Sequence, residues 1–453
     1  MNAMEARATW SLASLFVFRM LGLFMVLPVF ALYGQELAGA TPFLIGLAIG
    51  AYGFSQALLQ VPFGYLSDRF GRKPMILLGL FLFLIGSVVA ALSTSIEGVI
   101  LGRILQGTGA IAGPVMALLS DLTREDQRTK AMALVGASIG LSFSLALITG
   151  PAVAGWFELG GVFWLTALMA LVGMALTLWV VPTPPSQRIR SRGPFKDQFR
   201  AVLRQTELLR LNLGVFLLHM TMTALFVVLP PLLVGQAQLD KNHHWQIYLP
   251  VLCVSFVLMI PLMILAERRQ MVKQVFLTAI ALLVTALLML ARWHDSLLAI
   301  LMGLLVYFWA FNLLEAMLPS LVSKVVAPAL RGTSMGIYST TQFLGAGAGG
   351  AVGGYLLGHN GMSFVLELAA ALVCIWLLVA AGMRQPRKLQ DYTLPLDHFD
   401  FDAVESASLV RRLLRVSGVE DVVVIPHEKA AYLKVDNQCL DKEQLRAVAA
   451  AAH

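Results

Sequence analysis

The chain has 453 residues, of which 58% are hydrophobic and only 13% charged, and its formal net charge at pH 7 is +7. A soluble globular protein of this size could not keep so apolar a composition in water. The Lys and Arg residues lie mostly in loops on one side of the predicted bundle, as the positive-inside rule describes, so the basic charge does not indicate a nucleic-acid partner.

Apolar runs of membrane-spanning length recur along the chain and predict an all-α polytopic membrane protein. The first run is long enough to remain as a spanning helix, and no signal-peptide cleavage pattern precedes it. An even number of spans places both termini on the same side. We predict twelve transmembrane helices at residues 11–34, 43–65, 74–93, 97–121, 129–152, 160–182, 208–234, 247–266, 273–292, 296–322, 333–357 and 362–383.

A polar linker at residues 183–207 divides the spans into two halves, 1–182 and 208–386. The positive-inside rule makes the linker side cytoplasmic. A weak internal repeat supports the division, because Asp68-Arg69 aligns with Glu267-Arg268 at a shift of 199 residues. Parallel six-helix repeats are a transporter architecture. The basic residues of the linker are Arg188, Arg190, Arg192, Lys196, Arg200 and Arg204.

Residues 387–453 form a polar tail with a different pattern. Strand-like and helix-like segments alternate in the order β-α-β-β-α, which predicts a small soluble ferredoxin-like domain on the cytoplasmic side. No fourth strand is visible before the chain ends.

The loop between the second and third spans reads "GYLSDRFGRKP". It resembles the major facilitator superfamily pattern G-x-L-x-D-R-x-G-R-+-x, where + is a basic residue, which implies a twelve-helix transporter fold. The matching residues with chemical roles are Gly64, Asp68, Arg69, Gly71, Arg72 and Lys73.

The same resemblance implies that Asp68 lies near the cytoplasmic start of the eleventh span, in the other half. That span begins near Gly332, and its N-terminal dipole end would attract a carboxylate. Asp121 and Arg128 are expected in the same charge cluster. We therefore expect a conformational latch that holds the cytoplasmic side closed; the alternative is an ordinary topology-fixing loop.

The fifth span contains "ITGPAVAGW", which resembles the G-P-x-x-G-G pattern of proton-coupled drug antiporters. The pattern is incomplete, because Ala154 replaces the first of its two final glycines. General close packing of membrane helices is the alternative explanation. The residues assigned to this motif are Gly136, Gly140, Gly150, Pro151 and Gly155.

Few ionisable residues lie inside the predicted spans, and such residues are costly in a membrane and commonly functional. Glu315 is the expected proton-coupling residue, with Asn312 beside it; a structural pair of Glu315 with Arg19 or His219 is equally open. Arg103 resembles the family's R-x-x-Q-G pattern in the fourth span, although an Arg near a helix end can also snorkel. The expected central-cavity residues are Arg19, Arg103, Gln106, His219, Asn312 and Glu315.

Many similar drug antiporters have an acidic residue in the first span, whereas this span has Arg19. Cationic substrates are therefore less expected, and Arg19 with Arg103 suits an anionic one. The tail also resembles the heavy-metal-associated fold. It lacks that fold's C-x-x-C motif, so we expect no metal site.

The resemblance implies a secondary transporter of the bacterial inner membrane that works by alternating access, with proton-coupled efflux of a small molecule. We expect protons and lipids as further partners, no cofactor, and a monomer. A proton-independent facilitator, a symporter, or a sensor that signals through the tail are the alternatives. An enzyme is not expected, because no nucleophile–base set, metal cluster or phosphate loop is found.

Overall fold

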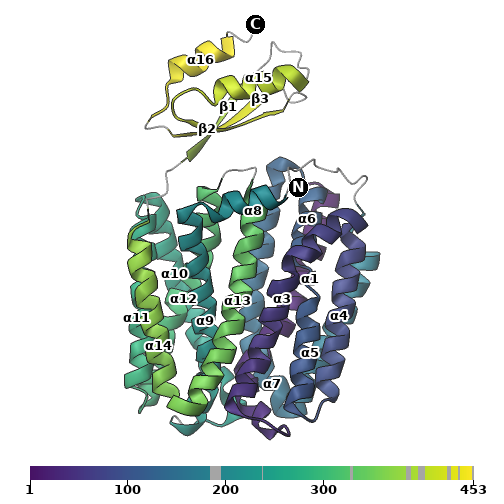
Figure 1. Ribbon diagram of the computed structural model, residues 1–453, viewed down its shortest axis with the longest axis vertical. Coiled ribbons are helices and arrows are strands. Elements are labelled where there is room, and N and C mark those ends of the chain that lie inside the picture. The colour runs from purple at the N-terminus through teal and green to yellow at the C-terminus, as the bar shows by residue number, and fades with distance from the viewer. Residues whose placement is uncertain are drawn as a thin grey trace. The chain divides into compact units, whose positions relative to one another are not determined.

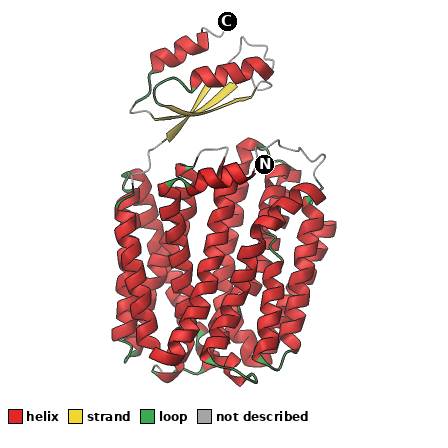
Figure 2. Ribbon diagram, in the orientation of Figure 1, coloured by secondary structure: helices red, strands yellow, loops and turns green. Residues whose placement is uncertain are grey.

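The computed structural model describes residues 1–183, 195–236, 238–326, 330–383, 389–395, 403–425, 430–436 and 439–450. The chain divides into two compact units, the helical bundle up to Met383 and the tail. In Figure 2 the described residues of the bundle are drawn as helices and loops, and the strands of the described residues lie in the tail.

The bundle consists of antiparallel helices that run between its two ends (Figure 1). Short 3₁₀ turns, η1 (Gly34–Glu36) and η2 (Lys241–His243), lie at one end. The helices are α1 (Ala3–Phe24), α2 (Leu27–Tyr33), α3 (Pro42–Phe70), α4 (Arg72–Leu92), α5 (Ile96–Thr108), α6 (Ala112–Leu122), α7 (Glu125–Trp179), α8 (Phe195–Leu203), α9 (Thr206–Gly235), α10 (Trp245–Arg268), α11 (Val272–Arg292), α12 (Leu297–Val325), α13 (Arg331–Asn360) and α14 (Met362–Ala381).

The twelve predicted spans all fall on helices, but four differ in detail. The first is interrupted between α1 and α2, and the fourth between α5 and α6. The fifth and sixth spans lie within α7, which is broken by non-helical backbone at Phe157 and Glu158, where φ of Glu158 is +57°. Ten helices of the described residues are long and apolar enough to cross a membrane; dividing α7 and adding the glycine-rich α13 gives twelve crossings.

We call the end of the bundle that carries the N-terminus, the α3–α4 turn and α8 the basic end, and the end with η1 and η2 the opposite end (Figure 1). Near the opposite end, α3 of the first half packs on α13 of the second half at backbone distance. A Cβ placed on Gly46 would lie 2.2 Å from the carbonyl oxygen of Gly350, and one on Gly50 would lie 2.3 Å from that of Gly347. Only glycine permits this approach.

The same two helices are not in such contact near the basic end. A Cβ on Gly64 of α3 or on Gly336 of α13 would meet no atom within 4 Å. Helices α3 and α13, one from each half, are therefore in close contact near the opposite end, and the described residues show no such contact between them at Gly64 and Gly336, near the basic end.

Two further contacts join the halves. At the opposite end Lys241 donates to Glu36 at 3.0 Å and lies 4.2 Å from the ring centroid of Tyr33. The hydrogen bond with Glu36 raises the pKa of Lys241. Deeper in the bundle, Phe143 of α7 has its ring centroid 6.0–6.3 Å from three aromatic rings of the second half. These rings belong to Phe226 of α9 and to Phe308 and Phe311 of α12.

The tail confirms the predicted order of elements. It contains β1 (Leu389–Pro395), α15 (Ala403–Leu413), β2 (Val419–Ile425), β3 (Ala430–Asp436) and α16 (Lys442–Ala450). The antiparallel sheet has the order β1-β3-β2, with a register irregularity between Val419 and Asp421. Apolar residues including Leu409, Leu413 and Leu433 form its core.

Candidate functional site

Glu315 lies inside α12, about 15 Å from the C-terminal end of the helix at 1.5 Å per residue. Its Oε1 accepts a hydrogen bond from Nε2 of Gln342 on α13 at 3.3 Å, and its Oε2 lies 3.6 Å from Nε2 of His219 on α9. The side chain is 34% exposed, yet Oε2 is buried and has no hydrogen-bond partner among the described residues. One carboxylate oxygen of Glu315 therefore faces His219 without a hydrogen bond among the described residues.

The hydrogen bonds of His219 indicate its tautomer. Its Nδ1 lies 3.1 Å from the carbonyl oxygen of Val215, which can only accept, so Nδ1 carries a proton. Its Nε2 lies 2.7 Å from Nε2 of Gln342 and accepts from that amide in the neutral imidazole. Gln342 thus donates to both His219 and Glu315 and joins three helices of the second half.

We expected Asn312 beside Glu315, and Gln342 was not among the predicted site residues. In the structure Asn312 instead donates to Ser255 of α10 at 2.9 Å. Glu315 lies three residues further along the helix, on a face turned toward α9 and α13. The only signal for Gln342 was a lone amide inside the eleventh span, and the sequence does not show which helix it would face.

Arg19 of α1 is 2% exposed and is enclosed within the first half. Its Nη2 donates to Oη of Tyr52 at 2.9 Å and to Oε1 of Gln56 at 2.7 Å, both on α3. The guanidinium carbon also lies 5.1 Å from the ring centroid of Phe83 on α4.

Arg103 of α5 is 1% exposed and is likewise enclosed. Its Nε donates to the carbonyl oxygen of Ala48 at 3.3 Å, and its Nη1 donates to Oε1 of Gln106 at 2.9 Å. Gln106 in turn donates to Ser87 of α4 at 2.8 Å. Arg19, Arg103 and Gln106, which we expected to line a central cavity, are at most 2% exposed in this conformation, with contacts to α3 and α4.

The charged residues of the α3–α4 turn form a cluster inside the first half. Arg72 forms an ion pair with Asp68, lies 3.4 Å from Oδ2 of Asp121, and donates to Oγ of Ser67 at 2.6 Å. Lys73 donates to the carbonyl oxygen of Val181 at 2.8 Å. The predicted association of Asp68 with Asp121 is therefore present, with Arg72 between them.

The predicted docking of Asp68 on the start of α13 is not found. Its side chain is 51% exposed, and its contacts among the described residues are with Arg72. The physical reason is the separation of the halves at the basic end. Gly71 makes the turn with φ +100°, and Arg69 lies over Phe70 at 5.7 Å. The side chain of Arg128 lies outside the described residues.

The glycine–proline motif of the fifth predicted span lies on α7, where its residues have two different environments. Gly150, followed by Pro151, packs against the break between α1 and α2, since a Cβ there would lie 2.5 Å from the carbonyl oxygen of Met25. Gly136 and Gly140 have room for a side chain, and Gly155 is exposed. Close packing explains Gly150 directly, whereas Gly136 and Gly140 have no tight contact in this conformation.

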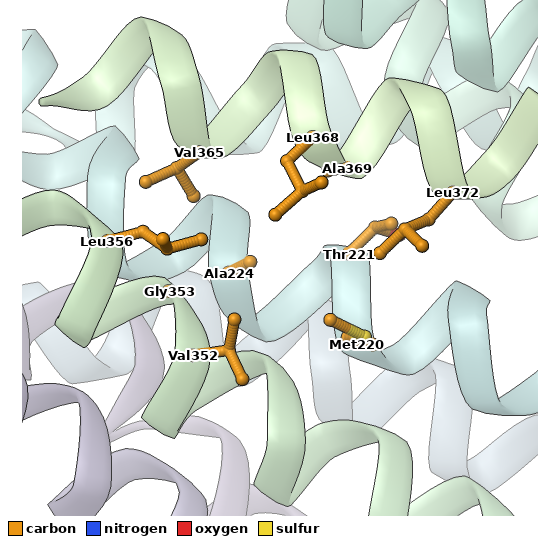
Figure 3. Close-up of a pocket in the computed structure, with 10 residues that line it drawn as sticks. All are labelled: Met220, Thr221, Ala224, Val352, Gly353, Leu356, Val365, Leu368, Ala369 and Leu372. Atoms are coloured by element: carbon orange, nitrogen blue, oxygen red, sulfur yellow. The ribbon is translucent and has the colours of Figure 1, made fainter. Parts of the chain in front are cut away.

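A small pocket lies between α9, α13 and α14 (Figure 3). Its lining is apolar apart from Thr221, whose hydroxyl already donates to the carbonyl oxygen of Leu218 at 2.9 Å. It offers no free polar group that would orient a substrate, so we do not place the functional site there.

Family models match the chain on both sides of the boundary between bundle and tail. The Major Facilitator Superfamily model matches residues 12–350 and 211–418, and the YajR YAM domain model matches residues 401–447.

Two curated relatives are similar over most of their length. The inner membrane transport protein YajR of Escherichia coli is 43% identical over 442 residues, which cover 97% of this chain and 96% of that protein. An uncharacterized transporter of Buchnera aphidicola is 36% identical over 76% of this chain and 89% of that protein.

Solved structures share the fold. The human organic anion transporter MFSD10 aligns with a TM-score of 0.64 and 22% identity, over 84% of this chain and all of that one. A bacterial homologue of the lysosomal transporter Spinster, in an inward-facing conformation, aligns with a TM-score of 0.67 and 14% identity, over 84% of this chain and 98% of that one. These relatives are transporters rather than enzymes, and the chain belongs to the major facilitator superfamily of multi-pass membrane transporters.

Proposed function

We propose that the protein is a proton-coupled exporter of a small molecule and that Glu315 carries the proton. The observation that supports this most directly is the buried, unpartnered Oε2 of Glu315, 3.6 Å from His219. Burial in a membrane favours the neutral form of a carboxyl group, whereas proximity to a protonated imidazole favours the charged form. Moving these groups relative to one another would therefore change proton affinity.

Alternating access supplies such a movement. We assign the basic end to the cytoplasm by the positive-inside rule, so the structure corresponds to the inward-open state. Closing the basic end would bring Asp68 toward the start of α13 and separate Glu36 from Lys241 at the opposite end. Helix α13 contributes Gln342 to the surroundings of Glu315 and glycines to the contact with α3. A shift of α13 would therefore couple opening and closing of the halves to the proton affinity of Glu315.

Proteoliposomes test the coupling. The protein is reconstituted with a pH-sensitive dye inside, and three probes of similar shape are added: benzenesulfonate, benzyl alcohol and benzyltrimethylammonium. We expect one of the three probes to cause proton movement in the wild type. In Glu315→Gln we expect that no probe causes proton movement. Glu267→Gln is the matched control, because Glu267 is an exposed α10 carboxylate near the basic end, 3.5 Å from Lys324. Unchanged proton movement in Glu315→Gln would refute the assignment.

A further inference from the structure

The first half contains two buried cations that share one aromatic ring. The guanidinium carbons of Arg19 and Arg103 lie 6.0 and 5.0 Å from the ring centroid of Tyr52. They come from α1 and α5 and approach the ring of an α3 residue. Cation–π contacts of this kind are attractive, but they do not neutralise two charges.

Part of each guanidinium is unpaired. Nε and Nη1 of Arg19 and Nη2 of Arg103 are buried and have no hydrogen-bond partner among the described residues. The partners that the other nitrogens do have are all neutral: a phenol, two amides and a carbonyl oxygen. A buried donor without a partner is costly, and a guanidinium keeps its proton in proteins.

Four carboxylates of the first half have other cationic partners. Glu5 pairs with Arg124, Glu36 with Lys241, and Asp68 and Asp121 both with Arg72. No ion pair to Arg19 or Arg103 is present within the described part of the chain. The two arginines therefore form a positive site that lacks an anion, and an uncompensated charge in a membrane protein usually marks a functional site.

A polar row on α3 extends from this site toward the basic end. Gln56, which accepts from Arg19, donates to Oε1 of Gln60 at 3.0 Å. The next residue at four-residue spacing is Gly64, where no atom would contact an added Cβ. The row therefore connects the arginines with the side on which the halves are apart.

We infer that the first half binds the anionic group of the transported molecule, a carboxylate, sulfonate or phosphate, between Arg19 and Arg103. The inference rests on the proposed transport function and adds its substrate class. The ligand-free site is enclosed, so entry of the anion requires α3 and its Tyr52 to move relative to α1 and α5. The bound anion would accept hydrogen bonds from the three unpaired guanidinium nitrogens.

Stability without any ligand gives the first test. Arg19→Met and Arg103→Met remove an uncompensated charge, so each variant is expected to melt at a higher temperature than the wild type. Arg72→Met is the matched control, because Arg72 has carboxylate partners and its loss should lower the melting temperature. Melting of the Arg19 and Arg103 variants below the wild type would assign both residues a purely structural role and overturn the inference.

Ligand binding gives the second test, in detergent and without a pH gradient. Benzenesulfonate and phenyl phosphate should raise the wild-type melting temperature saturably, and benzyl alcohol and benzyltrimethylammonium should not. The shift should vanish in Arg19→Gln and Arg103→Gln and persist in Glu315→Gln, which separates this inference from proton coupling. Absence of a shift with both anions, or an equal shift in the arginine variants, would contradict it.

Discussion

Gln342 donates its side-chain amide to Nε2 of His219 at 2.7 Å, and the same amide reaches Glu315 at 3.3 Å. This geometry fits a neutral His219. If His219 gained a proton on Nε2, two donors would face each other, and the amide of Gln342 would have to turn to offer its oxygen. Gln342 therefore links the protonation of His219 to the hydrogen bonding of Glu315.

Replacing Gln342 tests this link. Gln342→Leu removes the donor to both groups while keeping a similar volume, so we expect transport to persist with a pH optimum displaced by about one unit or less. The measurement is probe flux against pH in proteoliposomes. Asn312→Leu is the control, because Asn312 bonds Ser255 and not Glu315. An unchanged pH profile in Gln342→Leu would exclude the link.

Asp68 should matter for transport more than for folding. In this conformation it is half exposed, and its ion pair among the described residues is with Arg72, so Asp68→Asn should cost less than ~1 kcal/mol of stability. The carboxylate is needed when the basic end closes against α13, and the variant should therefore lose most of its flux. Thermal melting and flux, measured on the same preparation, separate the two effects. Normal flux in Asp68→Asn would refute the latch.

We expect the folding stability to depend on pH through His244. It is fully buried just before α10, and burial lowers its pKa from 6.5 to about 4. Above pH 6.5 the imidazole is neutral in both folded and unfolded states. As the pH falls, the unfolded state takes up the proton first, so folding loses up to ~3 kcal/mol between about pH 6.5 and pH 4.

The variant His244→Phe should reduce this loss, which thermal melting between pH 7 and pH 4 would measure. His243→Phe is the neighbouring control, because His243 is exposed and lies 3.8 Å from Asp240. If both variants retained the wild-type pH dependence, the burial of His244 would not be its cause.

The close contact between α3 and α13 predicts opposite effects for two glycine substitutions. Gly50→Val would clash with the backbone of Gly347 and should reduce the population of this conformation. Gly64→Val meets no atom here and should instead hinder closure of the basic end. Labelling rates of single cysteines at the basic end should therefore fall in Gly50→Val and rise in Gly64→Val. Equal rates in both variants would contradict the assigned closing surfaces.

The spans could be predicted from the sequence because lipid requires long apolar helices with internally paired backbones. Helix α11 (Val272–Arg292), for example, agrees with the predicted 273–292 to within one residue. The non-helical backbone at Phe157 and Glu158 lies between the predicted spans 129–152 and 160–182, in agreement with the prediction.

The contacts of the site could be predicted less well from the sequence, because they depend on conformation as well as on residue type. Nothing in the sequence indicates that the halves are apart at the basic end, and this separation decides where Asp68 lies. Likewise, the presence of Arg19 in a span predicted a functional cation, but not that Tyr52 and Gln56 of the neighbouring helix would enclose it.

The most direct test of the central claim, that proton loading of Glu315 moves the two halves, is a distance measurement at both ends of the bundle. Spin labels would be placed at residues 70 and 332 at the basic end, and in a second sample at residues 43 and 360 at the opposite end. We predict that lowering the pH from 8 to 5, or introducing Glu315→Gln, changes the two distance distributions in opposite directions. Distributions that are the same at both pH values and in the variant would contradict the account.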